Sequence, residues 1–265
     1  MNILVCIKQV PDTTEIKIDP VTNTLIRDGV PSIVNPFDAY ALEMALRLKD
    51  QQDATVIVMS MGPPQAKSAL KECLAVGADK AYLVSDRAFG GSDTLATSYI
   101  LSRAIRAVEE KTGKFDLIFC GKQAIDGDTA QVGPEIAEQL GYSQITFATE
   151  VDYEDGKVCA IRETEHGKEV WESRIPVVLT ASKPEFELRY PTVRARLAAI
   201  RTEIPMLALG DISAEAERSG LKGSPTKVKK SYVPPRKAGG VMICEASANA
   251  SAVKLAAMLS EIGLV

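Results

Sequence analysis

A loop between residues 120 and 134 carries the residue types that could hold a phosphorylated ligand. Its sequence, CGKQAIDGDTAQVGP, follows an apolar run that predicts a strand, and it leads into a helix expected to begin near Gly133. Open α/β sheets bind their ligands at such positions, outside the carboxyl ends of the strands. Amide groups at the helix start, the Thr129 hydroxyl, and Lys122 or Gln123 could then hold phosphate and ribose oxygens. The loop therefore predicts a nucleotide site.

Three glycines in this loop, Gly121, Gly127 and Gly133, would let the backbone come close to a ligand. The same residues also fit a purely structural loop in which an Asp side chain caps the following helix. Neither a G-x-G-x-x-G fingerprint nor a Walker sequence occurs in the chain. No standard nucleotide motif therefore separates these two interpretations.

Two other segments are expected at the same edge of the sheet, each where a predicted strand ends or a predicted helix begins. Their polar or small residues are Cys6, Lys8, Asn35 and Asp38 in one segment, and Ser85, Asp93 and Thr94 in the other. Asn35 and Ser92 are also good helix caps without any ligand. The joint occurrence of the segments is what favours a nucleotide crevice.

The elements that must position these residues follow a regular rhythm. Apolar, β-branched runs lie at residues 3–7, 55–61, 81–84, 115–120 and 176–181, and helical patterns lie at 36–50, 64–76 and 93–111. This alternation predicts βαβ units and an α/β fold, with an open, mostly parallel, Rossmann-like sheet and helices on both faces.

Several shorter elements are predicted around this framework. Residues 146–152, 157–164 and 168–174 resemble three strands joined by turns, which predicts an antiparallel extension of the sheet. The polar region 11–31, with alternating residues at 15–18 and near 25–26, predicts a small hairpin. A short basic helix is expected over 193–204.

The last part of the chain loses this rhythm. Residues 219–240 are rich in Gly, Pro and basic residues, and an amphipathic stretch follows at 246–262. A segment with this composition rarely packs on its own core. It predicts an arm that lies on a partner, and a flexible tail is the alternative. We therefore divide the chain into a nucleotide-binding domain over 1–209 and an extended arm with a terminal helix over 210–265.

The composition excludes several classes of protein. The chain has a single histidine, His166, which lies in a predicted turn. This argues against a metal site built from several histidines and against most Ser-His-Asp catalytic triads. Five widely spaced cysteines without a C-x-x-C pair argue against a disulfide framework and a thiolate metal site. The net charge of -4 lacks the excess of basic residues that is typical of nucleic-acid-binding proteins. No apolar stretch reaches the roughly 20 residues of a membrane span, and no signal-peptide pattern follows Met1, so we expect a cytoplasmic protein.

Four motifs resemble those of a known family. They are ILVCIKQVPD at residues 3–12, NPFD at 35–38, GKQAIDGDT at 121–129, and RYPT at 189–192 before the basic helix. Together they resemble the β subunit of electron transfer flavoprotein, over essentially the whole chain. The resemblance implies an adenine-nucleotide-binding α/β domain that pairs with an α subunit and carries electrons to an acyl-CoA dehydrogenase-type flavoenzyme. The C-terminal arm would then lie on the α subunit.

The cofactor depends on the branch of the family. A simple electron shuttle holds AMP in its β subunit, whereas the electron-bifurcating branch holds a second FAD. Gly127 and the residues after it resemble the bifurcating branch, because the shuttle pattern has a third carboxylate and bulkier residues there. The resemblance then implies hydride transfer from NADH, with one electron for ferredoxin and one for the α-subunit FAD. A shuttle with AMP, or a non-redox nucleotide-binding regulatory module, remains the alternative.

The resemblance also implies a recognition loop for the dehydrogenase, anchored by an apolar residue at Val193, where shuttle-type sequences have leucine. Val193 could instead pack under its own helix. The candidate partner-binding residues are Tyr190, Val193, Arg194, Arg196 and Leu197. The candidate cofactor-binding residues are Cys6, Lys8, Asn35, Asp38, Ser85, Asp93, Thr94, Gly121, Lys122, Gln123, Asp126, Gly127, Asp128, Thr129, Gln131, Val132 and Gly133. No catalytic residue or metal ligand is expected, because the cofactor carries the chemistry of the complex.

Overall fold

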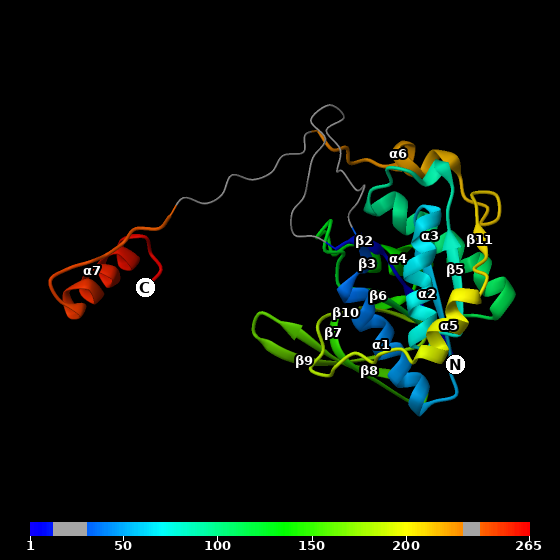
Figure 1. Cartoon of the computed structure of the whole chain (residues 1–265), viewed down its shortest axis with the longest axis horizontal. Coiled ribbons are helices and arrows are strands. Elements are labelled where there is room, and N and C mark those ends of the chain that lie inside the picture. Colours follow the sequence, from blue (N-terminus) through cyan, green and yellow to red (C-terminus); the bar gives the residue numbers. More distant parts are fainter. Residues whose placement is uncertain (13–30, 230–238) are drawn as a thin grey trace. The chain divides into compact units, whose positions relative to one another are not determined.

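The computed structural model describes residues 1–12, 31–229 and 239–265 (Figure 1). The chain divides into two compact units, of which the first contains the described residues up to 229 and the second contains residues 239–265. Within these described ranges, no helix is long and apolar enough to cross a membrane.

The first unit is built on a nine-stranded sheet with the order β11-β5-β4-β1-β6-β10-β7-β8-β9. Its strands are β1 (Asn2–Cys6), β4 (Thr55–Met61), β5 (Lys80–Val84), β6 (Leu117–Gly121), β7 (Ser143–Glu154), β8 (Lys157–Thr164), β9 (Gly167–Arg174), β10 (Val177–Ala181) and β11 (Met206–Leu207). Neighbours from β11 to β7 are parallel, whereas β7, β8 and β9 pair antiparallel. A separate antiparallel pair is formed by β2 (Gln9–Pro11) and β3 (Ser32–Val34).

Helices cover both faces of the sheet. They are α1 (Pro36–Gln51), α2 (Lys67–Val76), α3 (Thr94–Thr112), α4 (Val132–Leu140), α5 (Val193–Arg201) and α6 (Gly220–Gly223), with short 3₁₀ turns at 64–66, 87–89 and 216–218. The core residues of α1 and α2 share one hydrophobic cluster, and those of α3 and α4 share a second. The mostly parallel, two-sided α/β fold is therefore confirmed.

The central strand β1 shows why the sequence forms this sandwich. Ile3 and Val5 join the cluster under α1 and α2, whereas Leu4 and Cys6 join the cluster under α3 and α4. Successive side chains of a strand point to opposite faces, so a strand covered on both sides needs an unbroken apolar run. The sequence at residues 3–7 supplies that run.

The structure corrects two predicted elements and adds one that was not predicted. β7 begins at Ser143 and pairs in parallel with β10 before it meets β8, so it closes the parallel sheet as well as starting the antiparallel extension. β11 was not expected, because its two residues carry no periodic pattern. The basic helix α5 ends at Arg201 and does not reach residue 204. The predicted hairpin strands at 15–18 and 25–26 lie outside the described residues.

The chain between residues 213 and 226 packs on α3. Ser219 and Ser224 are buried, and the Ser224 hydroxyl accepts the Asp93 N–H at 2.8 Å. The first residues of the predicted arm, up to 226, therefore also contact their own domain. The division at residues 209 and 210, and the docking of the arm on a partner, stay predictions.

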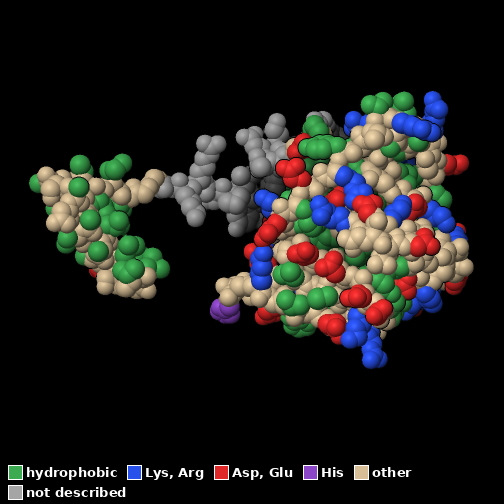
Figure 2. Space-filling model, turned by 90° about the horizontal axis from the view of Figure 1, so that it is seen from below, with side chains coloured by type: hydrophobic (Ala, Val, Ile, Leu, Met, Phe, Trp, Pro, Cys, Tyr) green, Lys and Arg blue, Asp and Glu red, His purple; other side chains and the backbone are tan. Residues whose placement is uncertain are grey.

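Within residues 239–265, the described part of the second unit contains one helix, α7 (Ala248–Glu261). Ser247 caps it by accepting the Ala250 N–H at 3.2 Å. None of its residues is buried, and apolar side chains such as Val253 and Leu255 are exposed. Hydrophobic side chains dominate the visible face of this unit in Figure 2. An isolated helix of this length is marginal in water, so α7 needs contacts with other elements to be stable.

Candidate functional site

The order of the strands reverses between β1 and β6. From β1 the chain builds outward through β4 and β5, and it then returns to place β6 on the other side of β1. In open α/β sheets such a switch point opens a crevice outside the carboxyl ends of the two strands. Lys8 follows β1 at this edge, and Gly121 ends β6. The structure therefore brings these two predicted site residues to the switch point.

The Asp38 carboxylate ties the two strand ends together. Its Oδ2 accepts the Lys8 N–H at 2.6 Å, and its Oδ1 accepts the Gly121 N–H at 3.1 Å. Burial raises the pKa of Asp38 to about 7, although hydrogen bonds from Asn35, Lys8 and Gly121 lower it. Gly121 is required here, because a Cβ would lie 2.3 Å from the Asp38 Oδ1. Both carboxylate oxygens are thus used to position backbone.

The Asn35 side chain holds the loop that follows β6. Its Nδ2 donates to the Gln123 carbonyl at 2.8 Å, and its Oδ1 accepts the Ile125 N–H at 3.1 Å. Asn35 occupies the N-cap position of α1, but its side chain makes no capping hydrogen bond. The interpretation of this side chain as a simple cap is therefore wrong. Its amide instead fixes the first turn of the candidate loop.

Two polar contacts fix the rest of the loop. The Lys8 Nζ lies 2.6 Å from Asp126 Oδ1, and the Gln123 Nε2 donates to Asp128 Oδ1 at 2.7 Å. Asp128 and Ala130 have φ angles of 52° and 54°, a conformation that non-glycine residues adopt rarely and that clusters at functional sites. We call the linked residues the switch-point network: Lys8, Asn35, Asp38, Gly121, Gln123, Asp126 and Asp128. Next to it, Gly127, Thr129 and Gln131 are exposed and Val132 is half-buried.

The first turn of α4 sits directly on the sheet. A Cβ at Gly133 would lie 2.5 Å from Thr180 Cγ2 and 3.4 Å from Cys120 Cβ, so only glycine allows this approach. The free N–H groups at the start of α4 therefore lie close to the carboxyl ends of β6 and β10, where an anion would be stabilised. Cys6 is buried below, and its hydrogen bond to Cys120, together with burial, raises the pKa of the Cys120 thiol.

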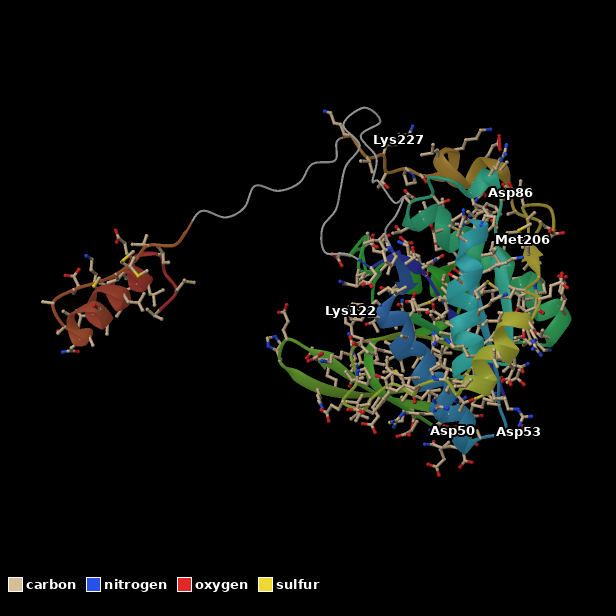
Figure 3. The ribbon with its side chains drawn as sticks, viewed as in Figure 1. Asp50, Asp53, Asp86, Lys122, Met206 and Lys227 are labelled. Carbon is tan, nitrogen blue, oxygen red and sulfur yellow. The ribbon has the colours of Figure 1, made fainter. Side chains whose placement is uncertain are left out.

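Ser85, Asp93 and Thr94 have other partners. The Ser85 N–H binds β11, and Asp93 caps α3 while accepting the Thr226 N–H at 3.0 Å. The Thr94 hydroxyl donates to Glu135 on α4 at 3.0 Å. Across the described part of the chain, none of the three bonds to the switch-point network. Figure 3 shows this separation: Lys122 lies on the side of the sheet toward β7, whereas Asp86, which follows Ser85 in the chain, lies on the side toward β11.

Sequence reasoning missed a group of aromatic and cationic side chains beside the loop. Phe147 has a φ of 61°, and its N–H donates to the Thr180 hydroxyl at 2.9 Å. The Lys122 Nζ lies 4.9 Å from the Phe147 ring centroid, and the Arg162 Cζ lies 6.0 Å from it. Arg162 also lies over Trp171, at 4.9 Å. No local pattern in the sequence predicts this group, because its members come from three strands and one loop.

The Arg162 Nε is buried and has no hydrogen-bond partner within the described structure. An unpaired buried donor is costly unless a ligand satisfies it. Together with Phe147, whose φ is positive, it brings a positive charge and an aromatic ring to this side of the loop. The described residues hold no group of three potential metal ligands.

The predicted partner-binding residues lie on and just before α5. Tyr190 is 92% exposed and Val193 is 78% exposed, while Arg194, Arg196 and Leu197 are also exposed. Val193 therefore does not pack under its own helix. Just upstream, Arg189 binds Glu43 at 2.9 Å, which holds the base of this surface on α1.

Comparisons with known proteins agree with this geometry. The family model described as the electron transfer flavoprotein domain matches residues 22–211. The electron transfer flavoprotein subunit beta of Megasphaera elsdenii is 54% identical over 246 residues, which cover 92% of this chain and 91% of the relative.

Two other relatives have more specific names. The caffeyl-CoA reductase-Etf complex subunit CarD of Acetobacterium woodii is 50% identical over 262 residues, covering 98% of both chains. The protein FixA of Azorhizobium caulinodans is 44% identical over 261 residues, covering 97% of this chain and 93% of the relative.

Proposed function

The chain belongs to the electron transfer flavoprotein family, as a β subunit, and we propose that it holds FAD in an electron-bifurcating complex. In this proposal the subunit binds the cofactor at the switch point between β1 and β6 and works only when paired with an α subunit. The cytoplasmic location expected from the sequence is part of the same proposal.

The observation that carries the proposal is the rigid loop after β6. Asn35 and Asp38 hold its base, and the Lys8–Asp126 ion pair holds its centre. A ligand that binds to this loop would meet a preformed surface, so little binding free energy would be spent on ordering the protein. The start of α4 and the Lys122 ammonium are suited to the pyrophosphate.

Space near Gly127 supports a ligand larger than a mononucleotide. A Cβ built on Gly127 would meet no atom of the described structure within 4 Å, so the loop faces an open region at this point. The shuttle pattern, with a carboxylate here, would fill part of that region and add negative charge near a phosphate. Gly127 therefore favours FAD over AMP.

The aromatic and cationic group beside the loop suits an isoalloxazine ring. Phe147 offers a flat apolar surface, and Lys122 and Arg162 supply positive charge next to it. Positive charge near a reduced, anionic flavin stabilises that state and so tunes its reduction potential. When bound, FAD supplies the chemistry in which a hydride from NADH is divided into one electron for ferredoxin and one for the α-subunit FAD. The second electron then reaches an acyl-CoA dehydrogenase-type flavoenzyme.

AMP in a non-bifurcating shuttle is the second candidate. The start of α4 and the loop amides would serve a single phosphate as well as a pyrophosphate. The two proposals differ in whether the isoalloxazine ring of FAD fills the region beside Gly127, Phe147 and Arg162.

Electron division can be measured on the purified complex of this chain, its α subunit and the partner dehydrogenase. We expect NADH to reduce ferredoxin only while an unsaturated acyl-CoA is being reduced. Gly127→Asp is the matched variant, and we expect it to lose FAD from the β subunit while still pairing with the α subunit. Acyl-CoA reduction that never requires or produces reduced ferredoxin would reject bifurcation and leave the shuttle.

A further inference from the structure

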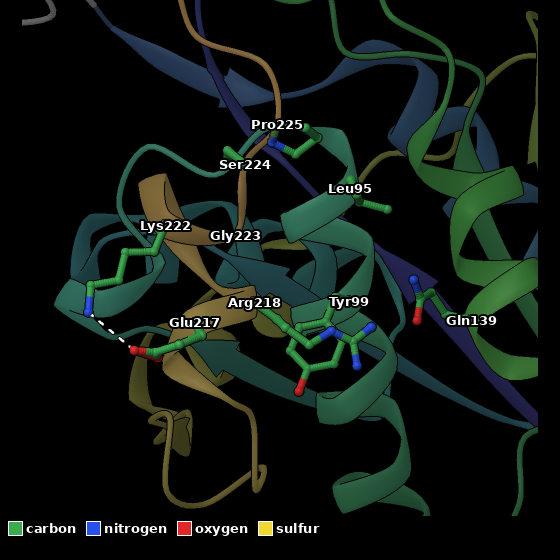
Figure 4. Close-up of a pocket in the computed structure, with 9 residues that line it drawn as sticks. All are labelled: Leu95, Tyr99, Gln139, Glu217, Arg218, Lys222, Gly223, Ser224 and Pro225. Carbon is green, nitrogen blue, oxygen red and sulfur yellow. Dashed lines mark hydrogen bonds and ion pairs between the residues drawn. The ribbon is translucent and has the colours of Figure 1, made fainter.

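Two adjoining hollows lie on the outer side of α3, away from the switch-point network. Their volumes are about 380 and 310 Å³. They share Tyr99 on α3, Gln139 on α4 and Arg218 on the segment that follows β11. In Figure 4 the Arg218 side chain lies across the Tyr99 ring, and its Cζ is 3.9 Å from the ring centroid. The two hollows thus meet at one stacked pair.

The segment that walls both hollows is firmly attached. The Tyr99 hydroxyl accepts the Glu215 N–H at 3.0 Å, and the Ser213 carbonyl accepts from Arg103 at 3.1 Å. At its other end, Thr226 donates its hydroxyl to Asp93 at 2.8 Å. The hollows are therefore a feature of the folded domain, with a shape fixed before any ligand arrives.

The smaller hollow is rich in positive charge. Arg103, Arg106 and Arg218 line it, together with one carboxylate, Glu215. Arg106 forms an ion pair with Glu109, in which Nη1 lies 2.9 Å from Oε2. Neither Arg103 nor Arg218 forms an ion pair within the described part of the chain. Two guanidinium groups therefore face one hollow with a single carboxylate to balance them.

Arg103 gives an independent sign of a missing partner. Its Nε is buried and makes no hydrogen bond in the described structure. Guanidinium groups prefer two parallel hydrogen bonds to one oxyanion, and Arg103 uses only its terminal nitrogen, on Ser213. Arg103 therefore keeps a donor that has no partner in the described structure, next to the hollow that this residue lines.

The larger hollow is different in character. Leu95, Tyr99 and Pro225 give it apolar walls. Apart from the shared Arg218, its charged residues Glu217 and Lys222 pair with each other at 3.5 Å. A ligand that fills both hollows would therefore place an anionic end among the arginines and a flat or aliphatic body against Leu95 and Pro225.

We propose that the two hollows form one site for an organic phosphate monoester. The phosphate binds Arg103 and Arg218, whose planar donors match its oxygens, and the organic body lies in the apolar hollow. The site shares no residue with the switch-point network, so it stands apart from the proposed function.

Binding can be measured by calorimetry on the complete complex with the α subunit, with its own nucleotides in place. The probes are phenyl phosphate, inorganic phosphate and phenol. We expect one phenyl phosphate per β subunit, weaker binding of inorganic phosphate, and none of phenol. Raising the salt concentration should weaken the binding of phenyl phosphate.

Variants test which residues hold the probe. Arg103→Gln and Arg218→Gln should each weaken phenyl phosphate binding by about tenfold or more, while Arg218→Lys should retain part of it. Arg174→Gln, an exposed arginine at the end of β9, is the control and should bind as the original complex does. Thermal unfolding of each variant establishes that it is folded.

Three results would overturn the proposal. The first is the absence of phenyl phosphate binding to the complex. The second is binding that the Arg103 and Arg218 substitutions leave unchanged. The third is binding of an acidic peptide without binding of phenyl phosphate, which would assign the hollows to a protein partner. None of these results depends on whether the switch point holds FAD or AMP.

Discussion

The Asp38 Oδ2 lies 2.6 Å from the backbone nitrogen of Lys8, at the end of the central strand. The other oxygen of the same carboxylate holds Gly121 at the end of β6. One buried charge thus sets the spacing of the two strands whose ends flank the candidate cofactor site. A protonated carboxyl has one oxygen that acts as a donor, so it cannot accept both N–H groups equally well.

Asp38→Asn should change how stability depends on pH. Burial raises the pKa of Asp38 from its ordinary value of 3.8 to about 7 in the folded protein. A raised pKa means that the stability from this group is present below pH 4 and is lost as pH rises toward 7. The unfolding free energy of the variant, minus that of the original protein, should therefore rise by on the order of 4 kcal/mol from pH 4 to pH 8. Urea unfolding across this range measures it, and a constant difference would show that Asp38 ionises as an exposed carboxyl does.

Gly133→Ala should destabilise the domain. The new methyl group would lie 2.5 Å from Thr180 Cγ2, and relieving the overlap must move α4 away from the sheet at an expected loss of about 1–3 kcal/mol. Because α4 begins beside the switch point, the variant should also bind less nucleotide. Gly210→Ala is the matched control, since its methyl group meets nothing within 4 Å and Gly210 is not among the candidate cofactor-binding residues. Equal unfolding midpoints for the two variants would contradict the tight approach of α4.

Removing residues 230–265 should abolish pairing with the α subunit. The first unit contains the described residues up to Lys229, and residues 213–226 already pack on α3, so a chain that ends at Lys229 should still fold. No residue of the removed helix α7 is buried, and most of its apolar side chains are exposed, so the helix needs a partner surface. Size-exclusion chromatography of the co-expressed subunits tests this. A shortened chain that still co-elutes with the α subunit would place the pairing surface elsewhere.

Val193→Asp should weaken docking of the dehydrogenase. Val193 is 78% exposed beside Tyr190 at the start of α5, and a charge at the centre of an apolar contact would have to be desolvated. We expect at least a tenfold higher concentration of dehydrogenase for half-maximal electron transfer, with Val193→Leu restoring or improving it. Reduction of the complex by NADH alone is the internal control. Unchanged transfer to the dehydrogenase would remove Val193 from the interface.

Much of the fold is readable from the sequence because a two-sided parallel sheet needs unbroken apolar strands. Residues 3–7 and 55–61 carry this signal clearly. β7 was harder to predict, because its first residues are exposed and its parallel pairing with β10 depends on contacts far along the chain. The two residues of β11 are too few for any pattern.

The candidate site was partly predictable for a related reason. Residues that follow strands or begin the next helices gather at the carboxyl edge, which is enough to place Lys8, Asp38 and Gly121 together. The sequence does not reveal that Asn35 binds the loop instead of capping α1, since both roles need the same side chain. Phe147 and Arg162 reach the loop only through the pairing of β7 and β8. No local pattern encodes that approach.

The nucleotide content of the complex tests the central claim most directly. The chain should be purified with its α subunit, denatured, and the released nucleotides separated and counted per heterodimer. We predict two FAD and no AMP, because the open region at Gly127 and the group around Phe147 can hold a flavin at the switch point. One FAD with one AMP would contradict the account and make this chain the β subunit of a simple electron shuttle.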